Sequence, residues 1–257
     1  MNSLEYIKED IQNIAEAILS VLNIDVTIVD ENLTRIAGTG RYLGKIGERL
    51  DGYSAFKKSL EEQISIIIDD PYASNICKEC DHRTFCKEYA EVCCPITLDG
   101  HSYGVIGLIA FTEGQKEIIR ENRDGLLNFL GKMADLISNK LKAQINTEEL
   151  ELEKKKLETL IDSMDRAIVS VDINGKIDKY NSKFKEIFNL NDSEVEDKSV
   201  VQVLNFINEP LNKDFKRYKS GMFFYRKNGY ELKGIYNINK ITVKDKLKGY
   251  VIDFIDK

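Results

Sequence analysis

The segment AIVSVDINGKIDKYNSKFKEIF, residues 167–188, contains a complete strand, turn, strand and helix pattern. Apolar and polar residues alternate over 167–171, which is typical of a strand with one buried face. Asn174-Gly175 is a favoured two-residue hairpin turn, and the residues after it supply the returning strand. Asn181 stands where the N-cap of the following apolar helix is expected. The segment therefore predicts two paired strands and a helix packed on them.

The end of the chain continues this pattern. Residues 222–256 divide into three strands, with turns at Asn228-Gly229 and at residues 244–248. With the two earlier strands they predict a five-stranded antiparallel sheet. Residues 150–257 resemble a PAS domain, a family in which a strand, a D-x-N-G turn, a return strand and an N-x-x-F helix open the fold. No histidine or cysteine lies beyond residue 101, which excludes a flavin–cysteine bond and a histidine-ligated haem from this half but not another small ligand.

The first 145 residues predict an α+β domain, in which helices flank an antiparallel sheet. The stretch CCPITLDGHSYGVIGLIAF, residues 93–111, resembles the paired strands of GAF domains, with a tight turn at Asp99-Gly100. Gly104 and Gly107 are expected to allow a close approach of the backbone. The predicted order is helix 4–21, strands 25–30 and 34–40, helix 53–63, strand 64–68, an irregular cysteine-rich insert over 75–94, strands 92–99 and 101–111, and a long helix from Glu113.

Residues 142–160 contain neither glycine nor proline and predict a linker helix between the two domains. Leu150, Leu157 and Met164 stand at heptad spacing, which is short for a coiled coil. Two interpretations stay open at this point. The segment is either a solvated linker or a dimerising signalling helix, and the second leads us to expect a homodimer.

All five cysteines fall within residues 77–94, in the order Cys77-x2-Cys80-x5-Cys86-x6-Cys93-Cys94. A CxxC pair directs two thiolates toward one point, and further thiolates nearby can complete a metal or iron–sulfur site. We expect an iron–sulfur cluster held by Cys77, Cys80 and Cys86 with Cys93 or Cys94 as the fourth ligand. Structural Zn²⁺ on the same positions and free redox-active thiols are the alternatives.

Adjacent residues on a strand point to opposite faces, so only one of Cys93 and Cys94 can face such a site. The other is expected to be a small buried apolar side chain. His82 and His101 are candidate replacement ligands, although a surface histidine without a ligand role is the commoner case for each.

Composition excludes several classes of function. The formal charge of −6 and the scattered lysines and arginines predict no nucleic-acid surface in this chain. No apolar run approaches the roughly 20 residues of a membrane span, and the charged N-terminus is no secretory signal, so a cytoplasmic location is expected. Neither a P-loop nor a kinase motif is present, and two histidines make a Ser-His-Asp set implausible. The chain is not expected to be an enzyme.

Three segments together resemble the sensory region of clostridial sigma-54-dependent transcriptional activators, namely residues 25–42, 76–96 and 104–111. In that family a GAF-like domain and a PAS domain precede an AAA+ ATPase and a DNA-binding helix-turn-helix. The resemblance implies a signal-sensing module whose partner is an effector domain or the sigma-54 machinery. The sequence stops at FIDK, where the ATPase would begin, so no ATPase or promoter activity is carried over.

Three hypotheses for function follow. The favoured one is a redox- or metal-responsive sensor that acts through the cysteines. The others are a dimerisation scaffold with a structural zinc site and a small-ligand-binding module in which the cysteines only brace the pocket.

Overall fold

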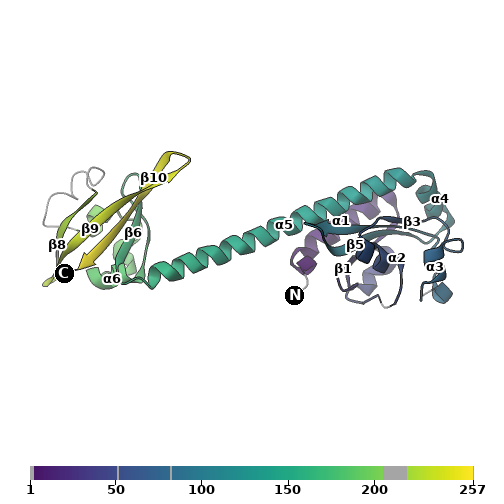
Figure 1. Ribbon diagram of the computed structural model, residues 1–257, viewed down its shortest axis with the longest axis horizontal. Helices are drawn as coiled ribbons and strands as arrows, with labels where there is room; N and C mark the ends of the chain where they lie inside the picture. The colour runs from purple at the N-terminus through teal and green to yellow at the C-terminus, as the bar shows by residue number, and fades with distance from the viewer. Residues whose placement is uncertain (1–2, 51, 82, 205–218, 257) are drawn as a thin grey trace. The chain divides into compact units, whose positions relative to one another are not determined.

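The structure is a computed structural model that describes residues 3–50, 52–81, 83–204 and 219–256. The chain divides into two compact units, Met1–Glu149 (unit 1) and Leu150–Lys257 (unit 2). Among the described residues, each unit holds one five-stranded sheet whose neighbouring strands all pair antiparallel (Figure 1). The predicted α+β class, with a GAF-like and then a PAS domain, is confirmed.

Unit 1 follows the predicted element order closely. Its sheet has the strand order β2-β1-β5-β4-β3. The elements are η1 (Ser3–Ile7), α1 (Lys8–Leu22), β1 (Asp25–Asp30), β2 (Arg35–Gly38), η2 (Gly40–Lys45), α2 (Ala55–Glu62), β3 (Ile66–Ile68), α3 (Asn75–Lys78), η3 (Arg83–Phe85), β4 (Ala90–Leu98), β5 (His101–Ala110) and α4 (Glu113–Glu121).

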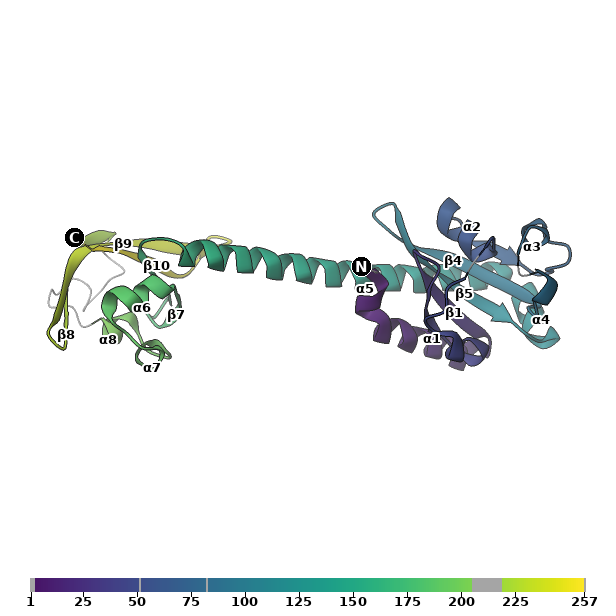
Figure 2. The ribbon, with the colours of Figure 1, turned by 90° about the horizontal axis from the view of Figure 1, so that it is seen from below.

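The two faces of this sheet bury different apolar clusters. Helix α1 and the first half of α5 (Arg123–Asp162) pack on one face, and α2 packs on the other (Figure 2). Gly104 lies where an added Cβ would be 2.2 Å from the carbonyl oxygen of Val29, so the close backbone approach expected there is present. Gly107 instead makes room for a side chain, because a Cβ there would be 2.4 Å from Cζ of Phe56.

The long helix predicted from Glu113 is two helices in the structure. Helix α4 ends before Asn122, whose side chain lies over Gly125 in the first turn of α5. Helix α5 then runs without interruption through the predicted linker, residues 142–160. Its buried residues, from Leu126 to Leu141, all precede the linker, which is mostly exposed.

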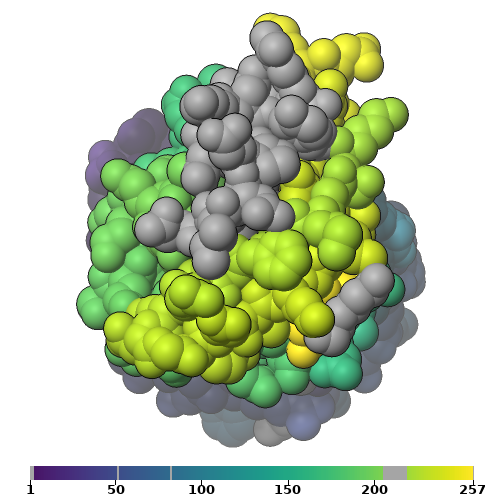
Figure 3. Space-filling model, turned by 90° about the vertical axis from the view of Figure 1, so that its left-hand side faces the viewer, coloured from purple at the N-terminus to yellow at the C-terminus, as the bar shows by residue number. Residues whose placement is uncertain are grey.

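Unit 2 has the strand order β7-β6-β10-β9-β8. The predicted turn at 244–248 is shorter than expected, because Lys244 and Asp245 alone form it with positive φ angles of 48° and 60°. In Figure 3 the lime and yellow strands lie beside the green segment that contains the helices. The elements are β6 (Ala167–Asp172), β7 (Ile177–Tyr180), α6 (Ser182–Phe188), α7 (Asp192–Val195), α8 (Val200–Val203), β8 (Ser220–Lys227), β9 (Tyr230–Val243) and β10 (Lys246–Asp256).

Aromatic rings fill the described core of unit 2. Phe188 contacts Phe184, Phe223 and Phe254 with ring centroids 5.0–5.7 Å apart. Such tilted and edge-on pairs are the favoured geometries for aromatic rings. The apolar side of the predicted helix, with Phe184, Ile187 and Phe188, is therefore the side that packs on the sheet.

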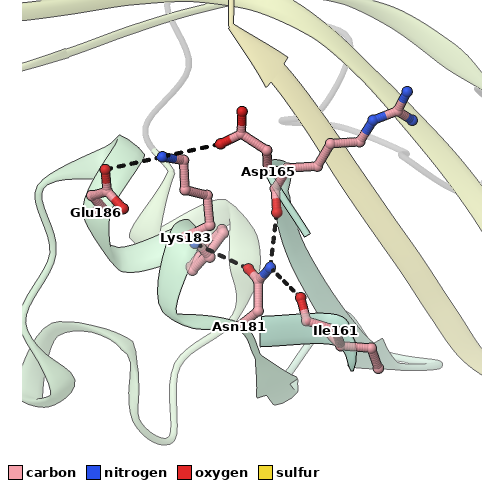
Figure 4. A network of polar contacts seen from close by, with 7 residues as sticks. Ile161, Asp165, Asn181, Lys183 and Glu186 are labelled. Carbon is pink, nitrogen blue, oxygen red and sulfur yellow. Dashed lines mark hydrogen bonds and ion pairs between the residues drawn. The ribbon is translucent and has the colours of Figure 1, made fainter. Parts of the chain in front are cut away.

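Asn181 connects the end of α5 to unit 2 (Figure 4). Its Oδ1 accepts from the backbone N–H groups of Phe184 and Ile168 at 3.0 and 2.8 Å, which makes it the predicted N-cap of α6. Its Nδ2 donates to the carbonyl oxygens of Ile161 and Arg166 at 3.1 and 2.8 Å. A side chain that is 1% exposed thus joins the last turn of α5, β6 and α6.

Among the helices that the structure describes, none combines the length and the apolar composition required to cross a membrane.

Candidate functional site

Unit 1 contains a cavity of about 630 Å³ on the sheet face that carries α2. Strands β1, β2 and β4 contribute Thr27, Arg35 and Glu91 to its wall. The remaining wall comes from η2, the N-terminus of α2, and the segment that includes α3 and η3. The cavity therefore lies between the sheet and the cysteine-containing insert.

Arg35 is a nearly buried cation in this wall, with 7% of its surface exposed. Its Nε donates to Thr27 Oγ1 at 2.8 Å, and its Nη1 lies 3.5 Å from the carbonyl oxygen of Lys45. Across the described residues its nearest carboxylate is that of the exposed Glu48, 4.0 Å away. Burial lowers the pKa of Arg35, although an arginine stays charged near neutral pH. The guanidinium is therefore held in place with weak ionic compensation.

Tyr42 places a hydroxyl group beside Arg35. The Tyr42 ring lies under the guanidinium, with 4.7 Å between the arginine Cζ and the ring centroid. Its hydroxyl donates to Glu88 Oε1 at 2.6 Å. Burial and the neighbouring Glu88 raise the pKa of Tyr42, so it remains a neutral donor.

Glu91 is a buried carboxyl on β4, 8% exposed. Its Oε1 has no hydrogen-bond partner among the residues that the structure describes. Burial first, and then the charge of Glu88, raise the pKa of this carboxyl well above 4.5. The neutral form is therefore favoured in the folded protein over a pH range in which an unfolded chain would carry the charge.

Replacement of Glu91 by glutamine is expected to stabilise unit 1 near neutral pH by about 1–3 kcal/mol, because it removes a buried group that is costly to ionise. A raised carboxyl pKa means that the folded state binds more protons. Stability is therefore greatest below the unfolded value of about 4.5 and falls as pH rises above it. Thermal unfolding of both proteins from pH 4 to 8 checks this.

The Glu91→Gln protein should show a flatter pH dependence than the wild type. Equal slopes for the two proteins would contradict the interpretation. Glu62→Gln, at an exposed position of α2, serves as the matched control and should follow the wild type.

Aromatic side chains form an apolar part of the wall. Phe56 packs over Gly107 of the sheet, and Phe111 lies 5.7 Å from Tyr42 between ring centroids. The Arg41 guanidinium stacks over the Phe111 ring at 4.3 Å. The cavity thus combines flat apolar surfaces with charged groups.

The cysteines separate into two groups in the structure. Cys77, Cys80 and Cys86 line the cavity and come from α3 and the residues that follow it. Cys93 and Cys94 lie on β4 and point to opposite faces of the sheet, as strand geometry predicts. Cys93 is fully buried on the cavity side, with its sulfur 3.9 Å from the carbonyl oxygen of Ala55, but it is not among the residues that line the cavity.

The surroundings of four of the thiols, those of Cys77, Cys86, Cys93 and Cys94, favour the protonated form. Burial raises the pKa of Cys77, and burial together with Glu88 raises that of Cys86 to about 11. Burial also raises the pKa of Cys93 and Cys94. Thiolates are the reactive form, so these four environments do not favour disulfide exchange at neutral pH.

Within the described part of the chain, no three histidine, cysteine or acidic side chains are arranged to hold a metal ion. His82, a predicted replacement ligand, lies outside the described residues. His101 is at the start of β5, 3.6 Å from Glu31, and is not among the residues that line the cavity.

Sequence reasoning did not identify Arg35, Tyr42 or Glu91 as site residues. The sequence does contain a signal for Arg35 and Glu91. Each is a charged residue in an otherwise apolar strand segment, RIAG and AEVCC, which is unusual for a buried strand. Tyr42 carried no such signal, since it follows a glycine-containing segment that reads as a turn.

Comparisons with known proteins agree with this architecture. A family model described as PAS fold matches residues 155–220. A regulator of Escherichia coli K12, UacR, named as a uric acid sigma-54-dependent transcriptional regulator, is 32% identical over 176 residues. That match covers 68% of this chain and 29% of the relative, so the chain corresponds to less than a third of that protein.

The crystal structure of the E. coli DhaR(N)-DhaL complex contains a chain with a similar fold. It is 14% identical, with a TM-score of 0.61, and the match covers 98% of this chain and 88% of that one. The similarity to the sensory region of sigma-54-dependent regulators that the sequence indicated is thereby confirmed. A regulatory role agrees with the name of the E. coli relative.

Proposed function

We infer that this chain is the sensory region of a sigma-54-dependent transcriptional regulator and that the cavity of unit 1 receives a small-molecule signal. The convergence of Arg35, Tyr42 and Glu91 on one cavity is the observation that supports this function best. Concave, partly apolar sites with a few placed polar groups are the usual form of small-molecule sites. In this role the chain acts in the cytoplasm, and its partner is an effector domain or the sigma-54 transcription machinery.

Helix α5 supplies a route for the signal. Its first half packs on the unit 1 sheet through residues such as Leu130 and Ile137. Its last turn is bonded within unit 2, where Asn181 donates to Ile161 and the backbone N–H of Ser182 donates to Asp162. A ligand that changes the packing of the sheet on α5 can therefore bias unit 2 through one continuous helix.

The exposed residues of α5 support a homodimer in this proposal. At a spacing of seven residues, Leu150 and Leu157 of α5 are 70% and 57% exposed, and Met164, which follows the end of α5 at Asp162, is 48% exposed. A second copy of the chain would cover them by pairing along the helix. Light scattering on the full chain and on Leu157→Lys, with Thr159→Lys as the matched control, checks this. A wild-type monomer would contradict it.

A compound that binds the cavity is expected to raise the thermal stability of the full chain by about 2.7 kcal/mol at 100 times its Kd. Urate is the first probe, because uric acid appears in the name of the E. coli relative. The panel also contains hypoxanthine, amino acids, dicarboxylic acids and amines, so that anionic, neutral and cationic compounds are all represented. Scanning calorimetry identifies hits and titration calorimetry measures their affinity.

The location of binding is tested by filling the cavity. Ala55 lines it and is 5% exposed, so Ala55→Leu should reduce the affinity of a hit at least about tenfold by occupying ligand volume. Ala143→Leu, on the exposed part of α5, is the matched control and should not. No hit in the whole panel, or a hit unaffected by Ala55→Leu, would contradict the proposed function.

The cysteines support a second candidate function, a metal or iron–sulfur sensor. Cys77, Cys80 and Cys86 lie on the same cavity, close enough that Cys77 and Cys80 both add to the raised pKa of Cys86. An iron–sulfur cluster, or Zn²⁺, bound there would order the insert around α3, because metal binding and local folding are coupled. Protonated thiols must lose their protons first, so the affinity for metal should increase with pH.

Anaerobic purification with a visible spectrum and metal analysis tests this candidate. Iron with sulfide and a brown colour that Cys80→Ser abolishes are expected for a cluster, whereas one zinc without colour is expected for a structural site. Cys94→Ser is the matched control, because Cys94 faces the opposite side of the sheet. A metal-free wild-type protein, prepared with iron and zinc supplied, would exclude both.

A further inference from the structure

Two ionisable residues that line the cavity are themselves almost completely buried, the cation Arg35 and the carboxyl group of Glu91. Buried charges are costly unless an opposite charge compensates them. Among the described carboxylates, only Glu48 approaches Arg35 to within 4.0 Å, and its side chain is 62% exposed. The bonds made by Arg35 use Nε and Nη1, and no bond to a described residue involves Nη2. A buried guanidinium with an unused N–H group can bind an anion through two parallel hydrogen bonds.

The lining of the cavity carries an excess of positive charge in addition to Arg35. Among the described residues, six basic side chains line the cavity against three acidic ones, although the chain as a whole carries a charge of −6. The acidic ones are Glu48, Glu88 and Glu91; the basic ones are Arg35, Arg41, Lys45, Arg49, Arg83 and Lys87. A concave site lined by an excess of one charge concentrates ligands of the opposite charge.

The three carboxyl groups do not cancel this excess at Arg35. Glu88 already accepts a hydrogen bond from Tyr42 at 2.6 Å, and Glu48 lies toward solvent. Glu91 keeps an oxygen atom without a partner among the described residues. That atom is a polar contact that a ligand can complete.

The shape of the apolar lining also indicates which class of ligand fits the cavity. Tyr42, Phe56 and Phe111 line the cavity with aromatic rings. The Tyr42 and Phe111 rings contact each other at 5.7 Å between centroids and 47° between planes, and the Arg35 and Arg41 guanidinium groups each lie over one of them. The ring surfaces that these guanidinium groups leave uncovered favour a planar ligand, because stacked and edge-on ring contacts depend on flat partners.

We infer that the cavity of unit 1 recognises a small planar anion, whose negative group pairs with the Arg35 guanidinium while its ring lies against Tyr42 and Phe111. This inference rests on the proposed function, since it names the chemical class of the signal. It also identifies Arg35 as the residue that selects for negative charge.

The test compares planar compounds that carry a carboxylate with close neutral analogues that lack it. Orotate is an anion and uracil its neutral counterpart, and nicotinate and nicotinamide form a second pair at pH 7.5. Titration calorimetry on the full chain should show at least about tenfold tighter binding of the anion in one or both pairs. In Arg35→Gln the affinity for that anion should fall about 30-fold, and the preference for the anion over its neutral partner should disappear.

Arg120→Gln makes the same change of charge at an exposed site of α4 and should bind like the wild type. If Arg35→Gln unfolds, as shown by its circular dichroism, Arg35→Lys takes its place. Lysine keeps the positive charge but lacks the two parallel N–H donors of arginine. The Arg35→Lys protein should therefore bind the anion about tenfold more weakly and still prefer it to the neutral partner.

Neutral partners that bind as well as the anions, an Arg35→Gln protein with an unchanged preference, or no binding by any of the four compounds would each overturn the inference. The proposed function is judged separately by the wider panel. A neutral or cationic hit there that Ala55→Leu weakens would leave the proposed function standing while this inference fails.

Discussion

Replacement of Asn181 by alanine is expected to lower the free energy of unfolding of unit 2 by about 3–4 kcal/mol. The side chain makes four hydrogen bonds to backbone groups and is 1% exposed. Each such bond contributes about 1 kcal/mol, and a buried group left without a partner costs more. Loss of the α6 N-cap is included in this figure.

The destabilisation caused by Asn181→Ala should be greatest where the last turn of α5 contacts β6 and α6. Amide hydrogen exchange is expected to become faster at Ile168 and Phe184, whose N–H groups lose their acceptor, and urea unfolding gives the overall change. Asn239→Ala, at an exposed position of β9, is the matched control and should change stability by less than about 0.5 kcal/mol.

If Asn181→Ala costs less than about 1 kcal/mol, the network in Figure 4 does not hold α5 against unit 2. The route that we propose for the signal would then lose its last step. The Asn181→Asp protein refines the result, because aspartate keeps both acceptor contacts and removes the two donated bonds to Ile161 and Arg166.

Replacement of Gly104 by alanine is expected to destabilise unit 1 by about 3 kcal/mol. The added Cβ would lie 2.2 Å from the carbonyl oxygen of Val29 and 2.8 Å from Cδ1 of Leu4. A side chain could rotate away, but the oxygen belongs to the backbone of β1, which pairs with β5 at this position. The two strands must therefore shift apart, and overpacking of this kind costs about 1–3 kcal/mol.

Gly114→Ala provides the matched control for this prediction. Nothing lies within 4 Å of a Cβ at Gly114 in α4, and alanine has the higher helix propensity, so this variant should be neutral or slightly stabilising. Chemical unfolding of both variants separates the two effects. A Gly104→Ala protein as stable as Gly114→Ala would show that β1 and β5 can adjust freely.

The elements were predictable because their signals are local. The strand, return-strand and helix-cap pattern around Asn181 depends on residues within a few positions of one another, and these parts are present in the structure. The turn at Asn174-Gly175 is longer than the predicted two residues, because β6 ends at Asp172 and β7 begins at Ile177. Strand alternation likewise required Cys93 and Cys94 to face opposite sides. The break at Asn122 was not predicted, because it depends on how one side chain lies over Gly125 within an otherwise helical pattern.

The cysteine cluster shows where sequence spacing stops being informative. Spacing along the chain places five thiols within 18 residues, but the sheet assigns three of them to a cavity and buries the other two on opposite faces. Whether Cys77, Cys80 and Cys86 bind a metal stays a prediction, because their distances to other ligands depend on the folded insert and not on their order.

The sequence by itself determined the two α+β domains, their order, the linking helix and the likeness to a regulatory family, because repeat period, turn residues and helix caps act over short distances. Only the tertiary structure revealed the cavity and the convergence of Arg35, Tyr42 and Glu91, which lie 56 positions apart at their extremes. Arg35 and Glu91 meet because the order β2-β1-β5-β4-β3 places their strands on one sheet, and Tyr42 follows from η2, directly after β2. Long-range pairing of this kind has no local signature.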